Sequence, residues 1–438
     1  MLKRFKVENF SSYRDKNYLD LTAGKSTSHQ NHLVEFPKVK ILKSAIVYGA
    51  NASGKSNLIK ALDYAREIIL KDLDRVDTYK KYFRLDSECM NRTTTFEFEL
   101  ELDNQFFAYG FSLKLEDKKV ESEWFYDIGK SKPEMIFERN NNSVELGRRL
   151  KKEKIKKRFE IYVDDMKNQS NQLFLNEIAN KELKIEEVKI LNQLYDWFDK
   201  KLIIIYPDTD YKTYITQNSE LFKIFKKYLN SFDTGIFDIT HIEEDFEQGL
   251  KDMPKDVKEQ VIYHIKENQE LYIRSSEGHI MKIYKRDNKL KVQKLGLLHS
   301  DKYREVFELK DESDGTKRLF DLIPLIGKFG EDYTIVIDEF DRSLHPKLAR
   351  KLFELFYSIR GGKSQLIATT HESNLLDLSL LRKDEIVFAE KDKNGASKLY
   401  SLAQFKVRYD KKIEQAYLLG RYGAIPIFKS FEQIDLEI

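Results

Sequence analysis

The residues best suited to chemistry form one short run, Gly49-Ala-Asn-Ala-Ser-Gly-Lys-Ser56, which fills every required position of the phosphate-loop pattern G-x-x-x-x-G-K-[ST]. In this pattern the two glycines let consecutive backbone N–H groups turn inward around a polyphosphate. Lys55 reaches the β- and γ-phosphates, and the Ser56 hydroxyl ligates Mg²⁺. The run therefore predicts a site for ATP or GTP with Mg²⁺, and the nucleotide contacts that we expect are Gly49, Asn51, Ala52, Ser53, Gly54, Lys55, Ser56 and Asn57.

The sequence on both sides of this run has the pattern that a phosphate loop requires. Residues 44–48 are typical of a short buried strand, and apolar side chains then recur at helical spacing, at Leu58, Ala61, Leu62, Ala65 and Ile69. The alternative is a glycine-rich turn that matches by accident. Such a turn would not need a strand before it and a helix after it, so the context favours the phosphate loop.

Two carboxylates follow a second apolar strand, Thr334-Ile-Val-Ile337. Ligands bind at the carboxyl ends of parallel strands, which is where Asp338 and Glu339 are expected to lie. In this Walker B arrangement Asp338 holds Mg²⁺, directly or through water, and Glu339 polarises the attacking water for phosphoryl transfer. The alternative is an ordinary pair of acidic caps at a strand end.

A third apolar strand, residues 365–370, ends at His371. A histidine there can contact the γ-phosphate and the attacking water, although a histidine at a strand end is more often structural. Its position one strand beyond the carboxylate pair favours the catalytic interpretation. The catalytic residues that we expect are Glu339, His371 and Lys55.

The segment Glu312-Ser-Asp-Gly-Thr-Lys-Arg318 precedes the Walker B strand and leads into an apolar helix at 319–326. A serine and a glycine at a helix N-terminus offer a hydroxyl, free N–H groups and the positive end of the helix dipole to an anion. We therefore expect Ser313 and Gly315 to contact a phosphate. The alternative is a Ser N-cap with an ordinary Asp-Gly turn.

Composition narrows the class of protein. The chain has 438 residues, which favours two structural units, and its 76 Lys and Arg nearly balance 73 Asp and Glu, which argues against a histone-like polycation. The single cysteine, Cys89, excludes an internal disulfide and a cysteine-based zinc cluster. No stretch approaches the roughly 20 apolar residues of a membrane span, so we expect a soluble, cytoplasmic protein with no membrane partner.

The chain divides into three expected parts. Alternating strands at 2–10, 18–21, 94–102 and 106–115 predict an antiparallel layer beside the nucleotide core. We expect residues 1–144 to form the first part of an ATPase head with this layer and the phosphate loop. Residues 145–269 then form a mainly helical insertion, and residues 270–438 complete the head with the signature, Walker B and His371.

The motifs together resemble a known group of proteins. The resemblance rests on Phe5–Tyr13, Gly49–Ser56, Glu312–Arg318, Asp338–Pro346, Thr369–His371 and Tyr417–Pro426. On these segments the chain resembles the ABC-type ATPase heads of the RecF, SMC and OLD group, and most of all the AAA-family ATPases of bacterial abortive-infection and anti-phage systems of the RloA-like, AbiL-like and PARIS types. It departs from transporter ATPases, because His345 stands where they have an aspartate and no Q-loop glutamine can be placed convincingly, Gln105 included.

The resemblance implies a fold and a mode of action. The fold would be an α/β phosphate-loop NTPase of the ABC-ATPase (RecF/SMC-head) type with an antiparallel β layer and a helical insertion. Two or more copies would assemble, with the Ser313 segment of one copy sealing the ATP held by another. OLD-type proteins add a nuclease domain for which too few residues follow His371, so we expect a separately encoded effector such as a nuclease, in phage defence. The main alternative is a RecF- or SMC-like ATPase of DNA maintenance.

One basic run, Arg148-Arg-Leu-Lys-Lys-Glu-Lys-Ile-Lys-Lys-Arg158, could contact nucleic-acid phosphates. It has no interleaved aromatic residues, so a solvated helix face is an equally good interpretation. The acidic run Glu243–Glu247 is most simply an exposed surface.

Overall fold

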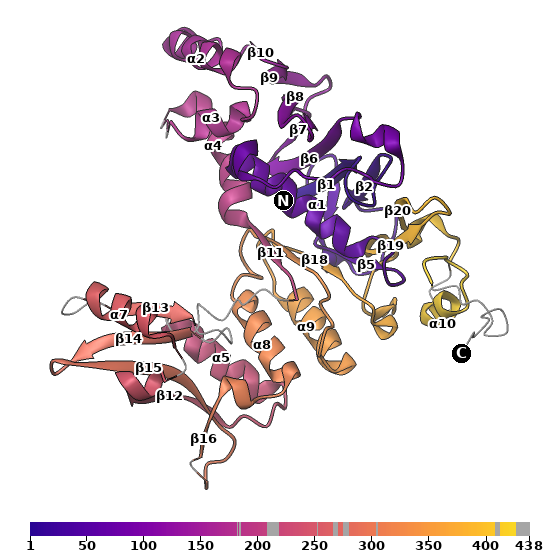
Figure 1. Ribbon diagram of the computed structural model, residues 1–438. Coiled ribbons are helices and arrows are strands. Elements are labelled where there is room, and N and C mark those ends of the chain that lie inside the picture. The colour runs from indigo at the N-terminus through magenta and orange to yellow at the C-terminus, as the bar shows by residue number, and fades with distance from the viewer. Residues whose placement is uncertain are drawn as a thin grey trace, which may run out of the picture. The chain divides into compact units, whose positions relative to one another are not determined.

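The computed structural model describes residues 1–181, 183, 185–207, 219–251, 253–265, 270–274, 280–303, 305–407 and 412–425. The chain forms two compact units (Figure 1). Unit 1 comprises Met1–Tyr206, Gly330–Asp341 and Phe353–Ile438, and unit 2 comprises Pro207–Phe329 and Arg342–Leu352. The expected part 145–269 is thus divided between the units after Tyr206, and the expected part 270–438 contributes to both.

A six-stranded sheet forms the nucleotide side of unit 1, with the strand order β11-β17-β18-β5-β19-β20. The first five strands of this order are parallel, and only β20 runs antiparallel to its neighbour. Their bounds are β11 Leu202–Ile205, β17 Thr334–Ile337, β18 Gln365–Thr369, β5 Ser44–Tyr48, β19 Ile386–Lys391 and β20 Ser397–Ser401. Every residue of β5, β17 and β18 is buried, as expected for the centre of a parallel sheet covered on both faces.

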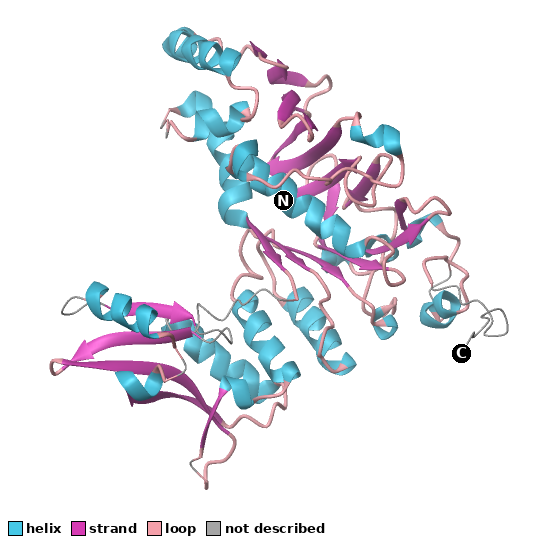
Figure 2. Ribbon diagram, viewed as in Figure 1, coloured by secondary structure: helices cyan, strands magenta, loops and turns pink. Residues whose placement is uncertain are grey.

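Unit 1 also contains a seven-stranded antiparallel sheet with the order β10-β9-β8-β7-β6-β1-β2. Figure 2 shows the strands in magenta. Its bounds are β1 Leu2–Glu8, β2 Asn17–Asp20, β6 Thr94–Leu102, β7 Gln105–Lys114, β8 Lys119–Asp127, β9 Glu134–Asn140 and β10 Ser143–Leu146. Aromatic side chains fill its inner face, where Phe5 lies opposite Phe98 with ring centroids 4.9 Å apart. The short hairpin of β3 (Leu33–Glu35) and β4 (Lys40–Leu42) completes the strands of this unit.

The helices of unit 1 pack against these sheets. Helix α1 (Lys55–Leu70) follows the phosphate loop and buries the apolar face that its sequence predicts, including Leu58, Ala61, Leu62, Ala65 and Ile69. The other helices are α2 Glu153–Asp165, α3 Phe174–Ala179, α4 Lys189–Asp196 and α10 Ile413–Leu418. The boundary between the units falls inside α9 (Pro346–Ser358).

Unit 2 contains a five-stranded antiparallel sheet and its own helices. The strand order is β12-β15-β14-β13, and β16 also pairs with β15. The bounds are β12 Asp238–Asp245, β13 Glu270–Arg274, β14 Ile280–Arg286, β15 Lys289–Leu298, β16 Val306–Glu308, α5 Ser219–Ser231, α6 Phe246–Gly249, α7 Lys255–His264 and α8 Asp314–Ile326. Helices α5 and α8 pack together through Phe225 and Phe320, whose ring centroids are 5.0 Å apart.

The predicted fold class is confirmed. A parallel sheet carries the phosphate loop after β5, and an antiparallel layer stands beside it. The predicted strands near 2–10, 18–21, 94–102 and 106–115 are present as β1, β2, β6 and β7. No described helix is both long enough and apolar enough to cross a bilayer.

Candidate nucleotide site

Strand order brings the three sequence motifs to one edge of the central sheet. Strand β18 lies between β5 and β17, and all three run parallel. The phosphate loop follows β5, His371 follows β18, and Asp338 follows β17, so the motifs leave the same edge of the sheet side by side. This is where ligands bind in parallel sheets.

The phosphate loop adopts a shape that only glycine permits at two positions. Gly54 has φ +110°, and an added Cβ would lie 2.2 Å from Ser397 Oγ. A Cβ on Gly49 would lie 2.3 Å from the carbonyl oxygen of Ala389. Larger residues would therefore displace the loop from the strands β19 and β20 behind it.

Side chains from outside the loop hold it in this shape. Ser397 Oγ donates to the carbonyl oxygen of Ser53 at 2.7 Å and lies 2.8 Å from Ser12 Oγ. The buried Tyr13 hydroxyl donates to the carbonyl oxygen of Gly54 at 3.0 Å, and the Asn57 amide donates to Ser12 Oγ at 2.9 Å. The loop is therefore tied to the β1–β2 connection on one side and to β20 on the other.

Lys55 is buried at the start of α1 and donates its ammonium protons to the carbonyl oxygens of Gly49 (2.7 Å) and Ala50 (3.1 Å). Burial lowers the pKa of Lys55 to about 8, and the carboxylates of Asp338, Asp341 and Glu339 act in the opposite direction. The cation thus lies in a partly desolvated loop, where its attraction for a phosphate is stronger than in water, and a bound cation would be needed to offset the repulsion between that phosphate and the three carboxylates.

His371 Nδ1 lies 3.5 Å from Lys55 Nζ. Burial and the Lys55 charge lower the pKa of His371, so its ring is neutral near pH 7. Its backbone N–H faces the Asp341 carboxylate, with both oxygens at 3.3 Å. A neutral imidazole at this point can accept or donate a hydrogen bond without repelling the neighbouring lysine.

The predicted Mg²⁺ ligands lie together. Ser56 Oγ donates to Asp338 Oδ1 at 3.2 Å, and the buried Asp338 also accepts from Thr369 Oγ1 at 2.5 Å. Thr369 Oγ1 in turn accepts from the backbone N–H of Glu339 at 2.8 Å. Glu339 has φ +46°, a left-handed conformation that is uncommon for a residue with a side chain and recurs at functional sites.

These residues fit Mg²⁺ and a nucleoside triphosphate. A hydroxyl and a carboxylate are oxygen ligands of the kind that Mg²⁺ prefers. The buried Ser53 Oγ has no hydrogen-bond partner among the described residues, as expected for a loop whose polar groups await a ligand. Bound Mg²⁺ and ATP would supply the reacting phosphate and neutralise its charge, and Lys55, Ser56 and Asp338 are the residues that would hold them.

Comparison with known proteins identifies the family. A family model described as "AAA domain, putative AbiEii toxin, Type IV TA system" matches residues 44–377. The chain belongs to this AAA_21 family. The match begins at the first residue of β5 and ends beyond His371, so the phosphate loop, the Ser313 segment and the Walker B strand all lie within the AAA_21 region.

Solved structures with a similar fold include three heads of SMC proteins. The SMC head domain from Thermotoga maritima is 12% identical, with 91% of this chain and 98% of that chain covered and a TM-score of 0.39. An SmcHead bound to the C-winged helix domain of ScpA is 13% identical, with 91% of this chain and 97% of that chain covered and a TM-score of 0.42. The third structure is the Smc head domain from Pyrococcus furiosus with an extended coiled coil, bound to the C-terminal domain of ScpA. It is 13% identical, with 96% of this chain and 98% of that chain covered and a TM-score of 0.40. No curated protein matches the chain.

The Ser313 segment of this AAA_21 protein lies in unit 2. Ser313 is the exposed N-cap of α8, and its hydroxyl accepts from the backbone N–H of Thr316 at 3.2 Å. A Cβ on Gly315 would lie 2.7 Å from the carbonyl oxygen of Ser343. The helix is therefore capped as the simpler sequence interpretation expects, with Ser313 and Asp314 exposed, Gly315 half-buried and Thr316 buried.

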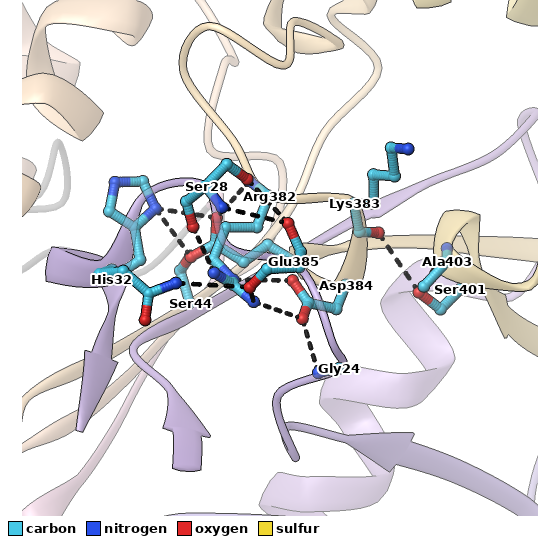
Figure 3. Close-up of polar contacts among 12 residues, drawn as sticks. Gly24, Ser28, His32, Ser44, Arg382, Lys383, Asp384, Glu385, Ser401 and Ala403 are labelled. Atoms are coloured by element: carbon cyan, nitrogen blue, oxygen red, sulfur yellow. Dashed lines mark hydrogen bonds and ion pairs between the residues drawn. The ribbon is translucent and has the colours of Figure 1, made fainter. Parts of the chain in front are cut away.

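A buried polar cluster anchors the strands of the AAA_21 core at their other end (Figure 3). Glu385 accepts from Ser44 Oγ at 2.7 Å and contacts His32 Nδ1 at 3.0 Å. The fully buried Arg382 meets Asp384 through two hydrogen bonds of 2.9 and 2.8 Å. Since Ser44 begins β5 and Glu385 immediately precedes β19, the cluster fixes these neighbouring strands beneath the phosphate loop.

Sequence reasoning missed several residues of the site. Thr369 and Asp341 orient Asp338 and His371, and Ser12 and Ser397 support the loop. Thr369 is the last residue of the apolar strand β18 and stands two residues before His371, so its position near the site could have been read from the sequence. Ser397 lies more than three hundred residues from the loop, and no local pattern could have linked the two. Of the segments that carry the resemblance, Pro426 lies outside the described residues.

Proposed function

We propose that this protein is a Mg²⁺-dependent ATPase that closes head to tail around two ATP molecules and thereby controls a separately encoded effector in anti-phage defence. The observation that carries the proposal is the convergence of Lys55, Ser56, Asp338 and His371 at one edge of the parallel sheet. Membership of the AAA_21 family, whose description names a type IV toxin–antitoxin system, supports the link to defence.

The chain's own residues divide the work of hydrolysis. Lys55 places a positive charge at the β- and γ-phosphates, and Ser56 and Asp338 orient the metal. Glu339, whose backbone is fixed by Thr369, aligns the attacking water and accepts its proton. His371 stays neutral and senses the γ-phosphate by hydrogen bonding.

A second copy would complete each site. Ser313 and Gly315 present a hydroxyl and free N–H groups at the positive end of α8, a helix of 13 residues. In the proposed dimer they contact the γ-phosphate held by the partner, so closure depends on the triphosphate and ends with hydrolysis. Higher homo-oligomers would build on this dimer, and ATP-dependent closure would hold or release the effector, such as a nuclease.

The experiment is light scattering of the full-length protein with Mg²⁺ and either ATP or ADP. We expect a dimer with ATP only, and we expect Ser313→Arg to remain a monomer that still binds ATP. The matched control is Ser231→Arg, at the exposed end of α5 in the same unit. Dimerisation of Ser313→Arg at wild-type ATP concentrations would contradict the composite site.

The alternative function is a RecF- or SMC-like ATPase of DNA maintenance, which the basic run at 148–158 would serve. The two functions differ in their dependence on an effector. Expression with the neighbouring genes should protect cells from phage and co-purify an effector if the defence role holds. Unchanged phage sensitivity together with damage sensitivity of a deletion strain would favour maintenance.

A further inference from the structure

Positive charge is concentrated in one segment of unit 1 that the proposed ATPase does not use. Residues 148–158 contain eight Lys and Arg and a single carboxylate, Glu153, whereas the whole chain has a net charge of only +3. The segment, called here the α2 basic segment, comprises the turn before α2 and the first half of that helix.

The α2 basic segment is anchored by few residues and exposes most of its cations. Ile155 and Phe159 are buried in the core of the unit. Because these two side chains point inward, the opposite face of α2 is exposed to solvent. The exposed cations are Arg148, Lys151, Lys152, Lys154, Lys156, Lys157 and Arg158. The packing of α2 therefore holds these charges on a defined surface instead of a loose tail.

Most of these charges form no ion pair within 4 Å among the described residues, although Lys130 and, from a distance, Arg149 and Arg148 lower the pKa of Glu134. Lys152 and Lys156 make only long ion pairs, at 3.9 Å to Glu187 and 3.8 Å to Glu160. Within the part of the chain that the structure describes, the remaining cations of the segment form no ion pair; they are Arg148, Arg149, Lys151, Lys154, Lys157 and Arg158. The other carboxylates of α2, Asp164 and Asp165, lie at its far end.

The arrangement opposes the stability of the helix that carries it. The N-cap is Lys152, which makes no side-chain cap, and lysines occupy the first turns, where the helix dipole disfavours cations. Lys154 also has like-charged neighbours three and four positions on, at Lys157 and Arg158, which repel it. Glu153 is the one carboxylate in the first turn of α2, and a sequence selected for stability alone would place more acidic residues there. Departures from local rules of this kind are expected at functional surfaces.

We propose that the α2 basic segment is a docking surface for the phosphate backbone of duplex DNA. The segment contains no Asn, Gln or aromatic residue, and Lys and Arg that contact phosphates bind the backbone irrespective of sequence. The nearest aromatic residues in the sequence offer little for stacking, because Phe159 is buried and the half-buried Tyr162 packs edge-on against Phe159 and lies near the Lys181 ammonium. Single-stranded nucleic acid is therefore the weaker ligand. A helix that contacts the phosphates on both sides of a groove fits the wide major groove of B-form DNA, whereas the major groove of A-form duplex RNA is too narrow to admit it.

The docking surface lies far from the nucleotide site within unit 1. Helix α2 lies beside β9 and β10, at one end of the seven-stranded sheet (Figure 1). The connection between β1 and β2, which supports the phosphate loop through Ser12, lies at the other end. Changes to the surface charge of α2 should therefore leave basal ATP turnover unchanged.

The test is fluorescence anisotropy of the full-length protein with a labelled 30-bp duplex DNA, titrated over about 50 to 200 mM salt. We expect sequence-independent binding that weakens steeply with salt. The variant K151E/K154E/K157E should bind at least tenfold more weakly at 100 mM salt, with a log–log salt slope smaller by about 0.9 for each phosphate that it no longer neutralises. Because the new carboxylates favour the helix dipole, its melting temperature should equal or exceed that of the wild type.

The matched control is K251E/K255E/K289E, which makes the same change of charge on exposed lysines of unit 2. It should bind within twofold of the wild type. Equal losses in both triple variants, or a wild type that fails to bind, would overturn the proposal, and so would tighter binding of duplex RNA, single-stranded DNA or polyglutamate. If the glutamate variant melts early, K151Q/K154Q/K157Q provides the same test with a smaller charge change. Absent ATPase activity would overturn the proposed function and leave this result standing.

Discussion

The hydroxyl of Ser397 occupies the space that a side chain at residue 54 would need, since a Cβ added to Gly54 would lie 2.2 Å from Ser397 Oγ. The same hydroxyl donates to the carbonyl oxygen of Ser53 at 2.7 Å. Ser397 begins β20, beyond the residues matched by the family model, which end at 377. A strand outside the family region thus shapes the loop inside it.

Ser397→Ala should weaken ATP binding by up to about tenfold, because a buried hydrogen bond is worth about 1 kcal/mol and the loop loses its preformed shape. The measurement is a titration with a fluorescent ATP analogue. The matched control is Ser401→Ala at the other end of β20. The Ser401 hydroxyl makes no hydrogen bond with the phosphate loop among the described residues and accepts from the Ala403 N–H at 3.1 Å. Equal effects of the two substitutions would show a general loss of stability instead of a positioning role.

Lys55→Ala should abolish nucleotide binding, since it removes the only cation that the loop itself contains. The same titration would detect a loss of at least about a hundredfold, as expected for a charged contact to a phosphate in a partly desolvated loop. Lys60→Ala, on the exposed side of α1, is the control and should bind as the wild type does. Retained affinity in Lys55→Ala would remove the phosphate role from this residue.

The edge of the sheet where the motifs meet was predictable because each motif is local. Asp338 and His371 directly follow apolar strands, and parallel pairing then places strand ends together without further information. The supports of the site were not predictable, because the contacts of Ser12 and Ser397 join segments far apart in sequence. The length of the chain indicated two units, but their boundaries were not predictable, since β11 returns to the central sheet directly after a helical stretch that resembles an insertion.

Glu339→Gln should bind ATP normally and hydrolyse it about 10²- to 10⁴-fold more slowly, because the amide cannot accept a proton from water. If the dimer closes on ATP, it should accumulate in this variant, which light scattering would reveal. Thr369→Val tests the support of the Glu339 backbone and of the Asp338 carboxylate, since it removes both the acceptor of the Glu339 N–H and the donor to Asp338, and it should lower turnover. Turnover of Glu339→Gln at the wild-type rate would exclude Glu339 as the base.

Glu123→Gln should destabilise unit 1 by about 1 to 3 kcal/mol, because a buried acceptor is replaced by a group that also donates. The fully buried Glu123 carboxylate accepts from the backbone N–H groups of Phe174 (2.6 Å) and Leu175 (3.0 Å) and from the Tyr109 hydroxyl (2.9 Å). Urea unfolding measures the change. The control is Glu121→Gln on the same strand. The ion pair between Glu121 and Lys114 is partly exposed, so its loss should lower the free energy of unfolding by less than about 1 kcal/mol.

The stability difference between wild type and Glu123→Gln should also depend on pH. Burial raises the pKa of Glu123 above its usual 4.5 despite the opposing charge of Arg139. The unfolded chain therefore loses this proton first, and wild-type stability falls as the pH rises from 4.5 through the folded-state pKa. The glutamine variant has no such proton, so the gap in unfolding free energy should narrow with rising pH. A gap that widens over the same range would show that the carboxylate is held ionised by Arg139 and its hydrogen-bond donors.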